Sequence, residues 1–234
     1  PAAGSRSPAA DALALLAGRP LVVLTGAGDR AFCVGQDLRE HAAGLADPDT
    51  DLGSTVREHY NPIVELLSTM PKPVVAAVNG VAAGAGAAFA FACDLRIAAD
   101  TAAVNLAFAG VALSCDSGAS WTLPRLVGAG RALDLLLRPR TISAAEALDL
   151  GILTEVVPAP ELSDRVAQVA AELAAGPTLA YASIRAAVRF SATHGLAESL
   201  ENEARGMDRT GASADHREAV AAFLEKRRPE LTGR

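Results

Sequence analysis

The run from Met70 to Cys93 limits most strongly what this chain can fold into. Its apolar segment Val74–Val78 predicts a buried strand, which Met70-Pro71-Lys72-Pro73 forces the chain to enter in an extended conformation. Residues 87–93 carry little bulk and predict a buried helix. Between the two, Gly84 and Gly86 form a corner that lets the backbone approach a ligand and leaves amide N–H groups free at the helix start. The corner can therefore hold negative charge, either on a bound phosphate or on an oxyanion that forms during a reaction.

Short apolar segments alternate with helical patterns up to about residue 157, and helical patterns alone follow. Strands are expected at 21–24, 74–78, 95–98, 103–107 and 156–157. Helices are expected at 56–70, with Pro62 bending the helix or marking its first turn, and at 117–123, 131–137, 144–150 and 162–175. Pro124 is expected to limit the second of these helices, residues 32–38 to form a loop, and residues 39–52 a mobile surface excursion. From 177 to 228 the chain reads as helical throughout, so the sequence predicts an α/β core with a helical C-terminal extension.

The charge and the cysteine content of the chain argue against several classes of partner and site. The net charge of −6 and the scattered basic residues argue against a nucleic-acid partner. Cys33, Cys93 and Cys115 are far apart and form no CxxC pair, which argues against a disulfide or a metal site and favours a reducing compartment. No apolar run approaches the ~20 residues of a membrane span, and the first residues do not resemble a signal peptide. We therefore expect a cytoplasmic protein.

The glycine corner could be a dinucleotide-binding turn, because Gly84-Ala85-Gly86 reads as a degenerate GxGxxG. The acid that should follow about 20 residues later is missing, which argues against that interpretation. Small residues that let a helix pack tightly explain the same pattern. A second glycine loop, Cys33 to Leu38, adds another possibility. Two strand-exit loops can direct two backbone N–H groups at one oxygen, which is an oxyanion hole.

Three segments, in this order and spacing, resemble the crotonase (enoyl-CoA hydratase/isomerase) superfamily. They are Ala-Phe-Cys-Val-Gly-Gln-Asp-Leu at 31–38, the block 71–86, and Asp-Ser-Gly-Ala-Ser-Trp-Thr-Leu-Pro-Arg at 116–125. The resemblance runs from about residue 20 to the C-terminus. Within the superfamily the sequence is most similar to the ring-epoxyphenylacetyl-CoA isomerases of aerobic phenylacetate degradation. Residues 35–38, 60–62, the Asp-x-Gly-x-x-Trp run and the tail 213–226 carry this closer likeness.

The resemblance implies a crotonase-type ββα spiral core over residues 1–175. It also implies a helical trimerisation region over 176–234, in trimers that often pair into hexamers. Family members carry a strand pair and an Asn-Arg-Pro segment before the first strand, and this sequence has neither. The expected partners are an acyl-CoA thioester and further copies of the chain, without a metal or redox cofactor, since CoA is part of the substrate.

Carried over residue by residue, the resemblance places the oxyanion donors at the amides of Gln36 and Ala85. Family hydratases use two glutamates to activate and protonate water, and the matching positions here hold Ala88 and Phe108. A hydratase of the usual mechanism is therefore disfavoured. Asp116 is the one acid left at a family catalytic position.

The chemistry of Asp116 can also be argued from its surroundings. It lies among apolar and small residues, and burial there would raise its pKa and make it a better base toward a carbon acid. The alternative is an N-cap, because Asp116 precedes a predicted helix. Its neighbour Cys115 could be a nucleophile, but no base adjoins it, and a free cysteine is more often a small core residue.

The remaining site residues also follow from the resemblance. Phe108 and Trp121 are expected to line the acyl pocket. Candidates for contacts with CoA are Asp37, Leu38, Phe223 and Lys226.

The leading hypothesis is an acyl-CoA isomerase that shifts a double bond or opens a ring epoxide, with Asp116 as acid and base. One alternative is a hydratase or a dehalogenase-like lyase that also uses Asp116. The other is a catalytically silent subunit that binds acyl-CoA or only supports an oligomer.

Overall fold

The computed structural model describes residues 16, 18–44 and 51–234. The chain divides into two compact units. One contains residues 23–68 and 75–166, and the other contains 18–22, 69–74 and 167–234. The predicted functional division between residues 175 and 176 stays a prediction.

The strands among the described residues form two four-stranded sheets. The first has the order β1-β3-β5-β8 and contains Val22–Thr25, Val74–Val78, Leu95–Ala99 and Glu155–Val157. The second has the order β2-β4-β6-β7 and contains Ala31–Cys33, Val81–Ala83, Ala103–Asn105 and Thr141–Ser143. β3 pairs with β5, β5 with β8, β2 with β4 and β4 with β6 in parallel, whereas β6 and β7 are antiparallel. All five predicted strands are confirmed, and β2, β4 and β7 were not predicted.

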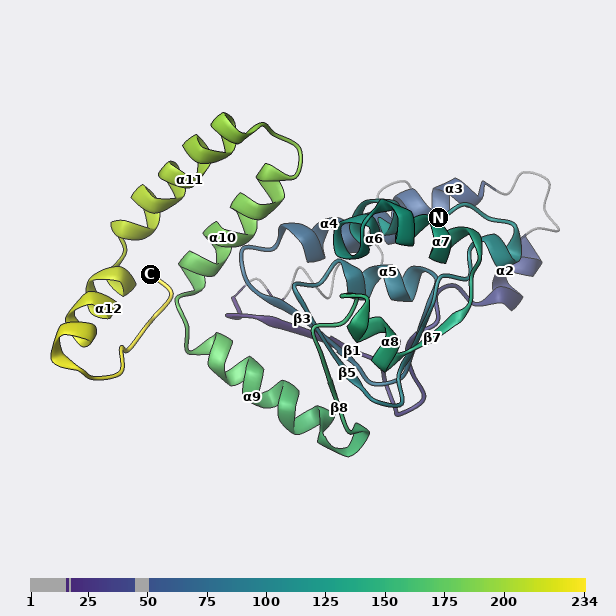
Figure 1. The fold of residues 1–234 in the computed structure, drawn as a ribbon, viewed down its shortest axis with the longest axis horizontal. Coiled ribbons are helices and arrows are strands. Elements are labelled where there is room, and N and C mark those ends of the chain that lie inside the picture. The colour runs from purple at the N-terminus through teal and green to yellow at the C-terminus, as the bar shows by residue number, and fades with distance from the viewer. Residues whose placement is uncertain (1–15, 17, 45–50) are drawn as a thin grey trace. The chain divides into compact units, whose positions relative to one another are not determined.

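The helices of this part of the chain follow the predicted order (Figure 1). The α-helices are α2 (Leu38–Gly44), α3 (Leu52–Thr55), α4 (Asn61–Thr69), α5 (Ala85–Phe91), α6 (Ala119–Val127), α7 (Ala129–Leu137), α8 (Ala144–Asp149) and α9 (Leu162–Ala174). A π-helix, η1 (Val56–Tyr60), precedes α4, and short 3₁₀ turns are η2 (Ala109–Val111) and η3 (Ala159–Glu161). The excursion predicted at 39–52 is instead helical at both described ends, and residues 45–50 lie outside the described part.

The two prolines in helices behave differently. Pro62 lies in the first turn of α4, which confirms one of the two expectations for it. The π-helix η1 ends just before it, where Asn61 N–H donates to Val56 O. Pro124 was expected to limit a helix, but it lies inside α6. Pro124 has no N–H to donate, but its carbonyl accepts from Gly128 N–H at 2.9 Å. The helix therefore continues for one further turn.

Strand β3 and helix α5 form the centre of the core. Every residue of β3 is buried, and α5 buries six of its seven residues. The Asn79 side chain after β3 fixes the neighbouring loop, because its Oδ1 accepts from Gly26 N–H at 3.0 Å and its Nδ2 donates to Gly28 O at 2.8 Å. The corner between β3 and α5 is thus held firmly to the segment that joins β1 to β2.

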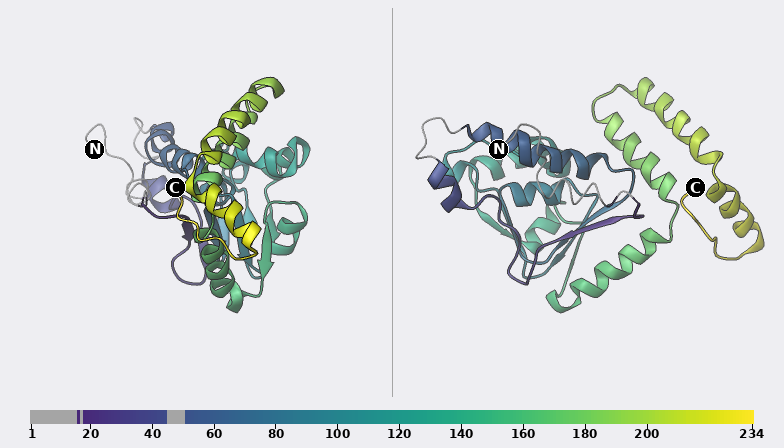
Figure 2. Two further views of the ribbon diagram at one scale, coloured as in Figure 1. Left: turned by 90° about the vertical axis from the view of Figure 1, so that its left-hand side faces the viewer. Right: turned by 180° about the vertical axis from the view of Figure 1, so that it is seen from behind.

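The C-terminal unit contains α10 (Thr178–Ser191), α11 (Leu196–Gly211) and α12 (Ala214–Glu225) (Figure 2). The prediction that 177–228 is helical throughout is therefore wrong at two breaks. Gly195 is the N-cap of α11, and the Ser213 Oγ caps α12 by accepting from His216 N–H at 3.0 Å. The tail folds back on α12, where the buried Asp215 accepts from the amides of Thr232 and Gly233 at 2.7 and 2.8 Å. None of the described helices has both the length and the apolarity to cross a membrane.

Candidate active site

The glycine corner begins α5 with a backbone conformation that favours glycine. Gly84 has φ of 53°, its N–H donates to Asn105 O at 2.9 Å, and α5 begins at the next residue. No side chain caps this end of the helix. The backbone of Ala85 is therefore presented at the helix start without a covering side chain from Gly84.

The second glycine loop packs directly against this corner. A Cβ built on Gly86 would lie 2.0 Å from the carbonyl oxygen of Cys33, so only glycine fits there. A Cβ built on Gly35 (φ 83°) would lie 3.6 Å from Ala85 N. The structure thus brings the residue before Gln36 against the amide of Ala85. The two loops that the sequence singles out lie side by side.

The end of this loop is held by local hydrogen bonds. Gln36 Oε1 lies 3.2 Å from Nδ1 of His41, one turn into α2. The Asp37 carboxylate accepts from Arg39 N–H at 2.7 Å and so caps α2, while Leu38 is exposed. The cap is a role for Asp37 that the sequence argument did not assign.

The side chains around the corner are apolar. Ala88 is fully buried on α5, and Phe108 is buried, with its ring edge 4.0 Å from a Cβ built on Gly84. Trp121 on α6 is 44 % exposed, and the Arg125 guanidinium lies 3.2 Å above its ring centre. Ala88 therefore offers only a methyl group here, and Phe108 only a phenyl ring.

Asp116 lies in the loop between η2 and α6 and is half-buried. Its main-chain oxygen accepts from Ala119 N–H at 2.9 Å, but the N-cap of α6 is Gly118, and no side chain caps this helix. The Asp116 carboxylate accepts instead from the Ser117 hydroxyl at 2.8 Å. Burial raises the pKa of Asp116, and the hydrogen bond from Ser117 opposes that rise only in part. The capping interpretation of this side chain is therefore wrong.

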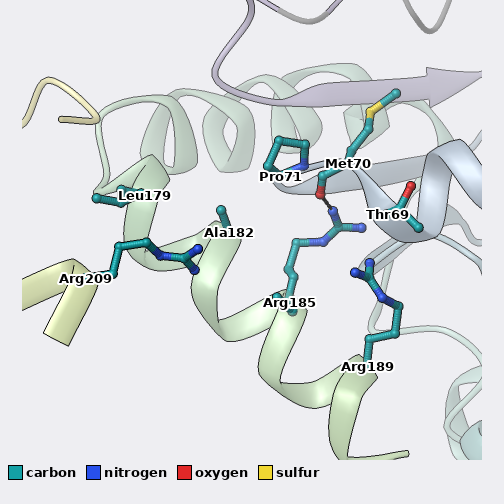
Figure 3. A pocket seen from close by; sticks show the side chains of 9 residues that line it. Thr69, Met70, Pro71, Leu179, Ala182, Arg185, Arg189 and Arg209 are labelled. Carbon is teal, nitrogen blue, oxygen red and sulfur yellow. Dashed lines mark hydrogen bonds between the residues drawn. The ribbon is translucent and has the colours of Figure 1, made fainter. Parts of the chain in front are cut away.

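A cavity of about 280 Å³ lies within the C-terminal unit, and none of the predicted site residues lines it. Its walls are formed by α10, by residues 69–71 and by Arg209 of α11 (Figure 3). Arg185 reaches across it to donate to Met70 O, and Arg209 donates to Ser183 Oγ at 2.6 Å. These arginines join α10 to the segment that leads into β3 and to α11. Arg185 and Arg189 are four residues apart on α10, so both side chains lie on one face of the helix. This spacing could have indicated the pair in the sequence.

The CoA-contact candidates in the C-terminal third lie at the end of α12. Phe223 is 82 % exposed, which is unusual for a large aromatic side chain. Lys226 is the C-cap of α12 in a left-handed conformation, with φ of 55°. Both side chains are accessible to a ligand or to another chain.

The parallel sheets, the glycine corner and the C-terminal helices define an α/β protein of the crotonase fold. The model of the enoyl-CoA hydratase/isomerase family matches residues 18–234, and the chain belongs to that family.

Individual relatives cover most of the chain. It is 43 % identical over 213 residues to the 1,2-epoxyphenylacetyl-CoA isomerase of Escherichia coli, covering 91 % of this chain and 81 % of the relative. It is 45 % identical over 214 residues to a probable enoyl-CoA hydratase of Rhodobacter capsulatus, with the same coverage. The crystal structure of an enoyl-CoA hydratase from Bacillus anthracis superimposes with a TM-score of 0.87 at 32 % identity, covering 97 % of this chain and 87 % of that one. The family is thus shown, whereas its members are named for both isomerisation and hydration.

Proposed function

We propose that this protein is an acyl-CoA isomerase that moves a double bond, or opens a ring epoxide, in a CoA thioester. The observation that carries the proposal is the distribution of acids at the site. By the resemblance, the two positions that match the hydratase glutamates hold the buried Ala88 and Phe108, and the half-buried Asp116 is the one acid left at a family catalytic position. The similarity to a 1,2-epoxyphenylacetyl-CoA isomerase supports the same reaction class and a role in phenylacetate degradation.

In the proposed reaction, the thioester oxygen of a 3-enoyl-CoA accepts hydrogen bonds from the amides of Gln36 and Ala85. The Asp116 carboxylate takes the proton from C2, and the electrons of that C–H bond move onto the thioester as an enolate. The enolate then re-forms the carbonyl, the double bond moves from C3–C4 to C2–C3, and C4 takes the proton from Asp116. Each oxyanion donor typically contributes about 10²–10³-fold to the rate, because it strengthens as negative charge develops.

Burial supports Asp116 as the base. A raised pKa makes the carboxylate a stronger proton acceptor, and it also makes the carboxylic acid available to return the proton. Phe108 and Trp121 provide the apolar wall of the acyl pocket in this proposal. The steps use only the substrate and side chains of the chain, and CoA is part of the substrate.

A substrate comparison tests the proposal. We expect the purified protein to isomerise a 3-enoyl-CoA at least about 100-fold faster than it hydrates crotonyl-CoA, since Ala88 and Phe108 are proposed to replace the glutamates that activate water in the hydratases. The ring-epoxide of phenylacetyl-CoA is expected to be converted as well. Product formation is followed by liquid chromatography of the CoA esters. Faster hydration than isomerisation would favour a hydratase, and binding of all three esters without turnover would favour a silent subunit.

Homotrimers or hexamers are part of the same proposal. Large apolar side chains are exposed along the C-terminal helices, namely Ile184, Val188, Leu196, Leu200, Met207, Phe223 and Leu224. Exposed large apolar side chains in this number are typical of a protein interface. In such an assembly Phe223 and Lys226 would reach the CoA of a neighbouring subunit, and Asp37 and Leu38 that of their own. We place the protein in the cytoplasm, since widely spaced cysteines suit a reducing compartment.

A charge in the apolar surface should weaken assembly. Met207 is 71 % exposed on α11, and Met207→Asp is expected to shift the sedimentation coefficient from that of a trimer or hexamer toward that of a monomer. The adjacent Asp208→Asn is the control and should leave assembly unchanged. Sedimentation velocity that finds the unsubstituted protein as a monomer would contradict the assembly.

A further inference from the structure

The residue after Asp116 has an unusual backbone conformation. Ser117 has φ of 51°, is only 1 % exposed, and is followed by Gly118 with φ of 75°. A side chain in the left-handed region is strained, because its Cβ approaches the following carbonyl oxygen. Such residues persist where the surrounding structure compensates for the strain, and they gather at functional sites.

The Ser117 hydroxyl contacts the carboxylate of Asp116. Its Oγ donates to Asp116 Oδ1 over 2.8 Å. A hydrogen bond to an ionised carboxylate is stronger than one between neutral groups, and it restricts rotation of the carboxylate. Since Ser117 is itself fixed by burial, the bond gives Asp116 one orientation.

We propose that Ser117 is a positioning residue for the reaction. Its hydroxyl holds Oδ1 of Asp116, so that Oδ2 is the oxygen that accepts the substrate proton. This inference rests on the proposed role of Asp116 as the base. It adds a residue that does not touch the substrate but determines which carboxylate oxygen meets it.

The charges around Asp116 leave Ser117 as its main polar influence. The neighbouring helix α5 has no titratable side chain, α6 carries Arg125, and α7 carries Arg131 and Asp134. Helix α4 approaches through Val64, whose Cγ1 lies 3.1 Å from a Cβ built on Gly118, and it carries Glu65. Burial and the Ser117 hydrogen bond are the influences that shift the pKa of Asp116, in opposite directions.

Two substitutions separate the hydroxyl from the backbone. Ser117→Ala removes the hydroxyl and keeps the strained Cβ, whereas Ser117→Gly removes both. If the hydroxyl positions Asp116, both variants should lose about tenfold in kcat with little change in KM. In both, the acidic limb of the pH–rate profile should move to higher pH, because the bond that favours the ionised carboxylate is gone. The proposal is overturned if Ser117→Ala keeps the wild-type pH–rate profile. It is also overturned if the two variants differ from each other in that profile.

A titration independent of turnover distinguishes this inference from the assignment of the base. The ¹³C resonance of the Asp116 carboxyl group, identified by its loss in Asp116→Asn, is followed against pH in the wild type and both Ser117 variants. A raised pKa in both variants supports the hydrogen bond, and an unchanged pKa overturns it. If Asp116→Asn isomerises at the wild-type rate while the Ser117 variants still shift this resonance, the proposed base is wrong and Ser117 has no role in the reaction.

Discussion

Asp116→Asn is expected to lower kcat for isomerisation of a 3-enoyl-CoA by about 10²–10⁴-fold, with KM changed much less. An amide cannot accept the C2 proton, whereas it keeps the shape of the carboxylate and much of its packing. Steady-state kinetics of the two proteins measure the effect. Asp149→Asn, an exposed substitution on α8, is the matched control and should keep the wild-type kcat.

The same substitution should not destabilise the fold. The pKa of Asp116 is raised in the folded protein, so the folded state binds more protons than the unfolded state in the range between the two pKa values. Stability therefore falls as the pH rises through that range, and at neutral pH the buried charge is a cost. Asp116→Asn removes it, and we expect a melting temperature at pH 7 equal to or above that of the wild type. A loss of activity with a lowered melting temperature would indicate unfolding instead of a missing base.

Gly86→Ala is expected to give the second large effect. The new Cβ would lie 2.0 Å from Cys33 O, and both groups belong to the backbone or are tied to it. The loop that carries Gln36 must then move away from α5. In the proposed site this separates the two oxyanion donors, and kcat should fall by about 10²–10³-fold. The overpacking should also destabilise the protein by about 1–3 kcal/mol, measured by denaturant unfolding.

Gly130→Ala provides the control for this prediction. Gly130 is also helical, on α7, and nothing lies within 4 Å of a Cβ built there. Alanine is the better helix former, so stability should rise by about 0.4–1 kcal/mol and kcat should not change. If Gly86→Ala behaves like Gly130→Ala, the close contact between the two loops is absent in solution.

The sequence predicted those elements of the fold that have a strong local pattern. Strand β3 is a run of five apolar residues, and α5 follows it with small residues, so both were found. Strands β4 and β7 were missed because they depend on pairing with β6, and such a long-range contact leaves no local pattern. Pro124 was misjudged because tertiary packing also holds this helix, in which the neighbouring Leu123 is fully buried. The break between α11 and α12 was missed although Ser213 is a typical N-cap residue, because the residues on both sides of it have a helical pattern.

For the site, the sequence identified the two glycine loops but not why each glycine is needed. Gly86 faces Cys33, 53 positions earlier in the chain, and such a contact leaves no local pattern. The two interpretations of Asp116 could not be separated in the sequence either, because an acid directly before a predicted helix suits both. The hydrogen bond from Ser117 to the Asp116 carboxylate distinguishes the two interpretations. Ser117 has a left-handed backbone conformation, which a serine in the sequence does not indicate. The hydrogen bond from Arg185 to Met70 O was missed because it depends on how α10 packs against the segment before β3.

The pH dependence of kcat for 3-enoyl-CoA isomerisation tests most directly whether Asp116 supplies the proton chemistry. The wild type should show an acidic limb, with kcat rising as one carboxyl group loses its proton and an apparent pKa above the ordinary range of aspartate. Asp116→Asn should show a low rate without that limb. A variant that keeps both the wild-type kcat and the wild-type acidic limb would contradict the account.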